Sequence, residues 1–270
     1  MWRRQLFDTL PTDLAAERYQ QNLGDKNISF ASKRQGVIEI EEIAVKQKNA
    51  TIHYTTLTFP PSFELTPNEY LEATKVIANQ IASLLPPKID MPLMVVGLGN
   101  PSMTVDALGQ ETVNMISATA HLHPSGICVY APGVTEATGV ATEKGVLGMV
   151  NVVHPRAVIV IDALCARSPS RLGNTIQLSN AGISPGSGLG RTTTSLSHKT
   201  LGVPVIAIGV PTLISTQALL LEAVSDVALS EPPPNFSKLL EDQFLYVCPK
   251  DIDTTILRAA ALLGDAINSL

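Results

Sequence analysis

The sequence predicts an α/β fold with three layers, in which helices cover both faces of a mainly parallel central sheet. Four short apolar runs rich in Val and Ile predict strands at residues 93–96, 127–130, 157–161 and 203–208. Runs of this length and composition are typical of strands that are buried on both faces. Helical patterns fill most of the gaps, at about residues 107–120, 142–153 and 215–229. This alternation indicates parallel strands joined by right-handed crossovers.

The first residues are predicted to be separate from the folded chain. Residues 1 to about 35 are polar and irregular, and we expect residues 1–11, which end at Leu10-Pro11, to form a disordered head. A single domain is expected to span residues 12–270, because no linker or internal repeat divides them. Its first element is predicted to be a short helix whose N-terminus is capped by Thr12 or Asp13.

Two strands and a long helix are predicted next. Apolar and charged residues alternate over residues 36–45, and residues 51–59 are rich in β-branched and aromatic side chains. The two stretches predict an N-terminal β-hairpin with one face in solvent. Thr66 and Glu69 have the spacing of a capping box with a proline between them, so we expect a helix from there to about residue 85.

The stretch between residues 162 and 203 interrupts the alternation of strands and helices. It is long and rich in Gly, Ser and Thr, and residues 175–178 are predicted to form a short strand within it. Loops of this length in compact domains are usually functional or mobile, so this stretch is a candidate for part of a site. The chain is predicted to end with an amphipathic helix over residues 251–270.

The composition excludes several classes of partner. A formal net charge of −5 over 270 residues provides no basic surface, so we expect no nucleic acid to bind. No apolar run is long enough to span a membrane, and the first residues lack the apolar segment of a secretion signal, so we expect no membrane partner. The three cysteines form no CxxC pair, which favours a reducing, cytoplasmic environment.

The residues give no strong signal for a cofactor or a metal ion, and we expect neither. The glycine turn at residues 97–102 is similar to a dinucleotide-binding turn, but Ser102 stands in the place of the third glycine. The histidines do not have the spacing of metal ligands. His121 is predicted to end the helix that begins near Asp106, about 20 Å from that acid, where a cation would be stabilised by the helix dipole.

Two aspartates are the candidates for catalytic work. Asp106 follows the predicted strand at 93–96 and a glycine turn, and Asp162 follows the apolar run at 157–161. In an open α/β sheet the carboxyl ends of parallel strands share one edge, so we expect the two side chains to lie close together. An aspartate in such a place can also act only as a helix cap, and for Asp106 that alternative stays open.

Two facing carboxyl groups have the chemistry that peptide hydrolysis needs. Burial raises the pKa of a carboxyl group, and two neighbouring carboxylates cannot both ionise at low cost. One of the pair therefore keeps its proton, and the other can act as a base towards water. Water attack on an amide requires this combination of base and acid. The sequence does not distinguish which of Asp106 and Asp162 would be the acid.

Several long motifs follow one another along the chain: GLGNPSMTVDALG at 97–109, APGVTEATG at 131–139, VIVIDALCARS at 158–168, TIQLSNAGISPGSGLG at 175–190, TLGVPVIAIGVPT at 200–212 and CPKDIDTTILRAAALLGDAIN at 248–268. These motifs, in this order, resemble the germination protease family, the spore endopeptidases that degrade small acid-soluble spore proteins. The resemblance covers most of the chain from residue 12 on.

The resemblance implies an atypical aspartic endopeptidase whose catalytic residues map by motif onto Asp106 and Asp162. It also implies a zymogen with a propeptide in the head at residues 1–11, a peptidase domain over residues 12–270, a homotetramer, and action in the cytoplasm of the forespore, the spore core. The fold is expected to be phosphorylase/hydrolase-like, similar to the hydrogenase-maturation endopeptidases. The cleft is expected to include Gly97, Gly99, Asn100, Arg167, Asn180, Ser184 and Ser187.

The glycine-rich loop departs from the family pattern. Where that pattern has Asp-Thr-Gly-Ile-His, this chain has Asn180-Ala181-Gly182-Ile183-Ser184, which removes a carboxylate and an imidazole. A catalytically silent spore protein that binds the same substrates therefore stays open as an alternative. The likeness to the maturation enzymes leaves open a metal-dependent endopeptidase. The head before Thr12 lacks Glu, after which these enzymes tend to cut, so self-processing is a weaker expectation than peptidase activity.

Overall fold

The computed structural model describes residues 12–19, 24–48, 50–184, 194–225 and 245–270, together with Leu10 and Gly186. The predicted head at residues 1–11, apart from Leu10, and the predicted cleft residue Ser187 lie outside the described residues. The division into a head and one domain stays a prediction.

The described strands form one mixed sheet. Its order is β1-β2-β3-β7-β8-β6-β4-β5, with β9 paired to β8. The β4–β5, β4–β6 and β6–β8 pairs are parallel, and the other described pairs are antiparallel. The prediction of a mainly parallel sheet is therefore wrong, because β7 enters antiparallel between β3 and β8 and joins the N-terminal strands to the parallel half. The strands are β1 (Ile28–Gln35), β2 (Ile38–Lys46), β3 (Thr51–Thr58), β4 (Leu93–Gly97), β5 (Ile127–Tyr130), β6 (Ala157–Ala166), β7 (Thr175–Ser179), β8 (Val205–Ser215) and β9 (Tyr246–Val247).

The N-terminal part of the sheet has a strand that the sequence pattern does not predict. β2 and β3 occupy the two predicted strand positions, and β1 pairs antiparallel with β2 from Ile28 opposite Val45 to Gln35 opposite Ile38. Most of β1 is exposed. An exposed edge strand needs no apolar face, so its sequence carries no alternation to reveal it.

Strands β6 and β8 continue well past their predicted ends at residues 161 and 208. They pair with each other from Val158 opposite Val205 to Ala166 opposite Ile214, with one irregularity after Leu164. Asp162 therefore lies inside β6 and not at its end. The sequence suggests an earlier end because an acidic residue and a glycine interrupt the apolar runs, whereas the pairing between the two strands continues through them.

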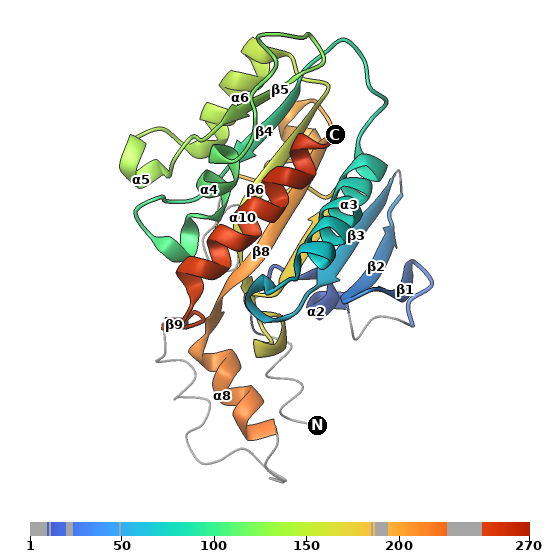
Figure 1. The fold of residues 1–270 in the computed structure, drawn as a ribbon, viewed down its shortest axis with the longest axis vertical. Helices are drawn as coiled ribbons and strands as arrows, with labels where there is room; N and C mark the ends of the chain where they lie inside the picture. The colour runs from blue at the N-terminus through green and yellow to red at the C-terminus, as the bar shows by residue number, and fades with distance from the viewer. Residues whose placement is uncertain are drawn as a thin grey trace.

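Helices cover both faces of the sheet. Helices α3, α4 and α10 pack with it in one apolar cluster, and α6 and α7 pack in a second. In β6, Ile161 belongs to the first cluster and its neighbour Val160 to the second, so the clusters lie on opposite faces. Figure 1 shows α3 and α10 side by side on one face, and α8 projecting away from the sheet. The helices are α2 (Ala15–Tyr19), α3 (Pro67–Leu84), α4 (Leu108–Asn114), α5 (Thr135–Thr138), α6 (Thr142–Val153), α7 (His198–Leu201), α8 (Thr216–Ser225) and α10 (Ile252–Asn268), with 3₁₀ turns η1 (Pro61–Phe63), η2 (Thr104–Asp106) and η3 (Pro169–Arg171).

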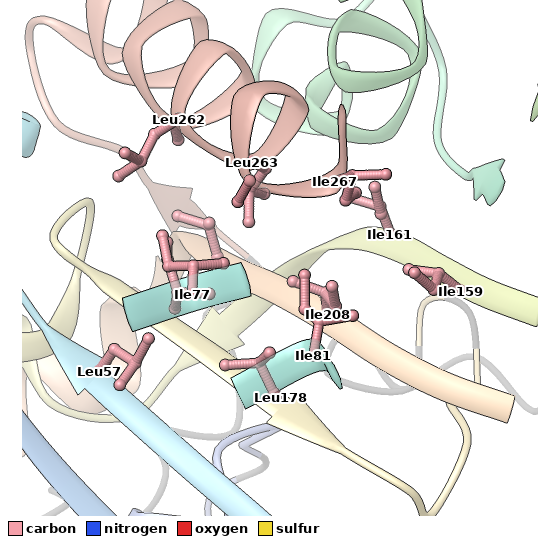
Figure 2. Packing of buried hydrophobic residues seen from close by; sticks show 14 of the residues in the cluster. Leu57, Ile77, Ile81, Ile159, Ile161, Leu178, Ile208, Leu262, Leu263 and Ile267 are labelled. Atoms are coloured by element: carbon pink, nitrogen blue, oxygen red, sulfur yellow. The ribbon is translucent and has the colours of Figure 1, made fainter. Parts of the chain in front are cut away.

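The main core lies under α3 and α10. Leu263 and Ile267 of α10 point towards Ile161 and Ile208 of the sheet, and Ile77 of α3 closes the side of this cluster (Figure 2). These side chains are almost completely removed from solvent. Burying one such side chain contributes about 1.5–3 kcal/mol, so this cluster holds β6 and β8 in place next to each other.

Several local predictions are confirmed. The Thr66 side chain accepts from the Glu69 N–H, and the Glu69 carboxylate accepts from the Thr66 N–H, so the capping box is formed at the start of α3. The terminal helix and the short strand β7 lie where they are expected. The predicted end of the helix at about residue 229 lies outside the described residues, which follow α8 only to Ser225.

Helix α4 is much shorter than predicted, and this changes the place of His121. The helix ends at Asn114 and not near residue 120. After it, the Met115 C=O and the Ser117 N–H bond to the Asn268 side chain, and the Thr119 N–H donates to the Ile127 C=O. These partners from α10 and β5 replace continued helical bonds. His121 lies in an exposed turn, so the expected stabilisation by a helix dipole is wrong.

None of the described helices combines the length and the apolar character that a membrane span needs.

Helix α4 approaches the sheet closely at Gly109. A Cβ atom at this position would lie 2.3 Å from the Leu98 carbonyl oxygen and 2.6 Å from the Ile161 carbonyl oxygen. Both neighbours are backbone atoms of the sheet and the loop after it, so they cannot rotate away.

Gly109→Ala should therefore lower the free energy of unfolding by about 2 kcal/mol or more, because α4 must move away from β4 and β6. Urea unfolding followed by circular dichroism measures this change. Gly148→Ala is the matched control, since Gly148 lies in α6, is exposed and has open space around its Cβ position. It should raise stability by about 0.5–1 kcal/mol through helix propensity alone. A Gly109→Ala variant as stable as the wild type would contradict the close approach.

Candidate active site

Asp162 lies where one strand of the sheet has ended and its neighbour continues. Gly97, the last residue of β4, is opposite Ile161, so β4 stops one residue before Asp162. On its other side, Asp162 is opposite Gly209 of β8. The Leu98 N–H still donates to the Ile161 C=O at 2.8 Å, and the chain then leaves the sheet. Asp162 therefore lies beyond the carboxyl end of β4 while it is still held within β6.

Asp106 is carried back towards this position by the chain that leaves β4. It ends the 3₁₀ turn η2, and its Oδ2 atom accepts from the Asn100 N–H at 2.8 Å. The N-cap of α4 is Ala107, whose side chain makes no capping hydrogen bond. Capping of α4 by Asp106 stays an alternative. The Thr212 hydroxyl donates to the Val105 C=O at 2.7 Å, which ties η2 to β8.

The two predicted cleft glycines allow this turn to form. Gly99 has φ +103°, and a Cβ atom there would lie 1.9 Å from the Asp106 carbonyl oxygen. A Cβ atom on Gly97 would lie 2.1 Å from the Gly109 carbonyl oxygen. Only glycine fits at these positions. Their absent side chains let the loop, including Asn100, close around Asp106.

The environment of Asp162 favours its protonated form. Its side chain is buried, with 4% of the residue exposed. Burial raises the pKa of Asp162 well above its usual value of 3.8, the charge of Asp106 raises it further, and the charge of Asp13 adds a smaller increase. The Ala163 N–H, which donates to the Asp162 carboxyl group at 3.0 Å, opposes them. The carboxyl groups of Asp106 and Asp162, far apart in the chain, are thus within electrostatic reach of each other.

Asp13, for which the sequence pattern predicts only helix capping, is within electrostatic reach of Asp162. Its Oδ2 atom accepts from the Cys165 N–H at 2.9 Å, and its own N–H donates to the Cys165 C=O at 3.1 Å. The carboxylate therefore bonds to β6. A Thr-Asp pair before a helix is the ordinary pattern of a cap, so no local signal reveals the contact with β6.

Arg167 is placed at the end of β6, where it holds the N-terminal segment. It is buried, and its N–H donates to the Glu17 carboxylate at 2.8 Å. Its guanidinium also donates to the Glu17 C=O. The other oxygen of Glu17 accepts from the Ser168 N–H at 2.8 Å. The structure thus gives Arg167 a role in anchoring α2, and its predicted contact with substrate stays a prediction.

A cavity of about 220 Å³ lies beside β6 and β8. It is lined by Asp13, Leu164 and Gly209, among others, and by the start of the glycine-rich loop, including Ser184. Asn180 does not line it. Its side chain instead accepts from the His53 N–H at 2.8 Å and donates to the Thr51 C=O at 3.3 Å, which ties the end of β7 to β3.

The arrangement places two carboxyl groups within electrostatic reach of each other. Burial and the charge of Asp106 favour the protonated form of Asp162, and Asp106 is half-buried and accepts a hydrogen bond from a backbone N–H. Among the residues that the structure describes, no group of three or more His, Cys, Asp or Glu side chains is placed to hold a metal ion.

Comparison with known proteins confirms the resemblance that the motifs carry. The family model described as germination protease matches residues 17–228. The chain is 35% identical to the germination protease of Clostridium acetobutylicum, over 92% of this chain and 82% of that protein. It is 37% identical to the one of Caldanaerobacter subterraneus subsp. tengcongensis, over 80% of this chain and 76% of that protein. For Clostridium tetani the identity is 32%, with 95% of this chain and 94% of that protein covered.

The family match spans both aspartates and the elements that carry them. The relatives from Clostridium acetobutylicum and Clostridium tetani align with nearly the whole chain, so their alignments include the same residues. The chain belongs to the germination protease family, and it is a peptidase.

Proposed function

We propose that this peptidase degrades small acid-soluble spore proteins during spore germination, and that Asp106 and Asp162 together activate the water that cleaves the peptide bond. The observation that carries the mechanism is a buried Asp162 whose proton is stabilised by the neighbouring charge of Asp106. The substrate class rests on membership of the family.

In the first step, Asp106 acts as the base and Asp162 as the acid. Water gives a proton to the Asp106 carboxylate as its oxygen bonds to the carbonyl carbon of the substrate. Asp162 gives its proton to the carbonyl oxygen, so a neutral tetrahedral diol forms and the proton count is conserved. The assignment follows the environments, since the more deeply buried group holds its proton more tightly.

In the second step, the roles reverse. Asp106 gives its proton to the amide nitrogen, and the C–N bond breaks. One hydroxyl of the diol returns its proton to Asp162 as the carbonyl of the new carboxyl group forms. Both aspartates then have the protonation states with which they began. A pair of positioned acid and base groups contributes about 10²–10⁴-fold per proton transfer, which is enough to make each group essential.

The cleft is proposed to lie between the loop after β4 and the glycine-rich loop. Gly97, Gly99 and Asn100 shape its Asp106 side, and Ser184 lies on the cavity beside β6. Arg167, Asn180 and Ser187 complete the proposed set. A phosphorylase/hydrolase-like fold, synthesis as a zymogen with its propeptide at residues 1–11, a homotetramer and action in the spore core are further proposals from the family.

One incubation separates this function from its alternatives. Purified protein is mixed with a small acid-soluble spore protein, with and without a chelator, and cleavage is followed by mass spectrometry. Cleavage in both samples supports the proposal. Cleavage only without chelator indicates a metal-dependent endopeptidase. Binding without cleavage indicates a silent protein, the alternative suggested by Asn180 and Ser184.

Asp106→Asn and Asp162→Asn should each lower the rate of cleavage at least about 100-fold, because each removes one partner of the proton transfers. The rate is measured with the same substrate at neutral pH. Circular dichroism should show an unchanged fold. Asp90→Asn, an exposed acid away from the pair, is the control and should cleave normally. Substantial activity in Asp162→Asn would rule out the aspartate pair.

Asp162→Asn should also change how stability depends on pH. The native pKa of Asp162 lies above its value in the unfolded chain. At pH values between these two pKa values, the native state therefore binds more protons than the unfolded state. The stabilisation from this proton is present below about pH 4 and is lost as the pH rises towards the native pKa of Asp162. Asparagine does not ionise, so the variant lacks this loss.

As the pH rises above about 4, the unfolding free energy of the wild type should therefore fall relative to that of Asp162→Asn. Urea unfolding at a series of pH values measures both free energies, and titrating groups that do not interact with Asp162 cancel in the difference. A difference that does not change with pH would mean that the pKa of Asp162 is not raised in the folded protein.

A further inference from the structure

We propose that Asp13 is a positioning residue of this active site, carried to the aspartate pair by an N-terminal strap, residues 12–19, which is bound across β6 and β7. This inference rests on the proposed function, in which Asp162 is the acid. It adds a third carboxylate to the site and makes the strap a part of the catalytic apparatus.

The strap is bound to the face of β6 on which Asp162 lies. Side chains alternate between the faces of a strand, so Asp162 and Leu164 share one face. Leu14, which is completely buried, packs with Leu164 and Ala166 in one apolar cluster. The residue next to Asp13 is therefore anchored two residues along β6 from Asp162.

Hydrogen bonds hold both sides of Asp13 in place. Asp13 exchanges two bonds with Cys165, one through its N–H and one through its Oδ2 atom. The Gln177 side chain of β7 bridges the next residues, since its Nε2 donates to the Asp13 C=O at 3.0 Å and its Oε1 accepts from the Ala15 N–H at 2.5 Å. The buried Glu17 anchors the far end of the strap to β6. A surface helix cap would need none of these bonds.

Asp13 also lines the cavity beside β6 and β8, which neither Asp106 nor Asp162 lines. Leu164 and Gly209 line the same cavity, and Gly209 is the residue opposite Asp162 in β8. A Cβ atom on Gly209 would lie 2.5 Å from the Leu164 side chain. The glycine at this position therefore allows Leu164 to pack closely against β8. The Asp13 carboxylate thus bounds the space next to the strand position of the acid.

The charges that act on Asp162 are both negative. They are Asp106, from η2, and Asp13, from the strap. Around Asp13 itself, Arg18 and Tyr54 line the cavity, and Cys165 and Tyr246 are within its electrostatic reach. The charge of Glu17 acts on Cys165. Asp13 therefore strengthens the hold of Asp162 on its proton, so that Asp162 stays an acid at a pH where Asp106 is ionised.

Asp13→Asn tests this role, because asparagine keeps an oxygen that can accept from the Cys165 N–H and removes only the charge. The alkaline limb of the pH profile of kcat should move to lower pH by about one unit, a tenfold loss of rate on that limb, while KM changes little. In Asp13→Glu, which keeps the charge, the alkaline limb should lie close to its wild-type position. A merely structural role would lower activity equally at all pH values.

Glu17→Gln is the matched control. It removes a negative charge of the strap that is not among the charges acting on Asp162, and the glutamine side chain keeps one oxygen that can accept from the Arg167 N–H. Its activity and stability are expected to fall without any movement of the alkaline limb. A shift in Glu17→Gln equal to that in Asp13→Asn would overturn the assignment to Asp13.

A carboxyl ¹³C NMR titration of Asp162, assigned with Asp162→Asn, separates this inference from the proposed function. A lower titration midpoint of Asp162 in Asp13→Asn supports the inference, whether or not the wild type cleaves a spore protein. Failure of the wild type to cleave would refute only the proposed function. An unchanged midpoint and an unchanged pH profile in a wild type that does cleave would overturn the inference alone.

Discussion

The site depends on the different lengths of neighbouring strands: β4 stops at Gly97, while β6 and β8 stay paired up to Ala166 and Ile214. Asp162 is the first residue of β6 past that stop. It therefore has the rigidity of a paired strand and, on one side, no neighbouring strand. The chain leaving β4 occupies that side and returns Asp106 to it through a turn that only glycines permit. The pairing of β6 with β8 and the close approach of α4 are what keep two distant carboxyl groups together.

In the proposed mechanism, the burial of Asp162 costs stability and supplies a proton donor. A carboxyl group buried next to other carboxylates favours the protonated form, and its ionisation would destabilise the native state. The surrounding structure offsets that penalty through the apolar core beneath α10 and through the backbone bonds that fix η2 and the strap. A buried carboxyl group whose pKa is raised is costly for folding once it ionises, and in its protonated form it can donate to a carbonyl oxygen.

The sequence predicted those features that local patterns determine. Apolar runs located the central strands, a capping box located α3, and two aspartates near strand ends located the candidate pair. What it missed depends on contacts between distant segments. The ends of β6 and β8 follow from their mutual pairing, α4 ends early because Asn268 and Ile127 take over its backbone bonds, and β1 is too exposed to show a pattern. Asp13 looks like a cap until β6 is folded beside it. The pair was predicted partly for the wrong reason, since Asp162 lies past the end of β4 and not of its own strand.

The most direct test of the central claim is whether Asp162 is protonated at neutral pH. An infrared difference spectrum between the wild type and Asp162→Asn measures this without substrate. The wild type should show the C=O stretching band of a protonated carboxyl group, and the variant should lack it. A difference spectrum that contains only the bands of an ionised carboxylate would contradict the acid role of Asp162 and the mechanism built on it.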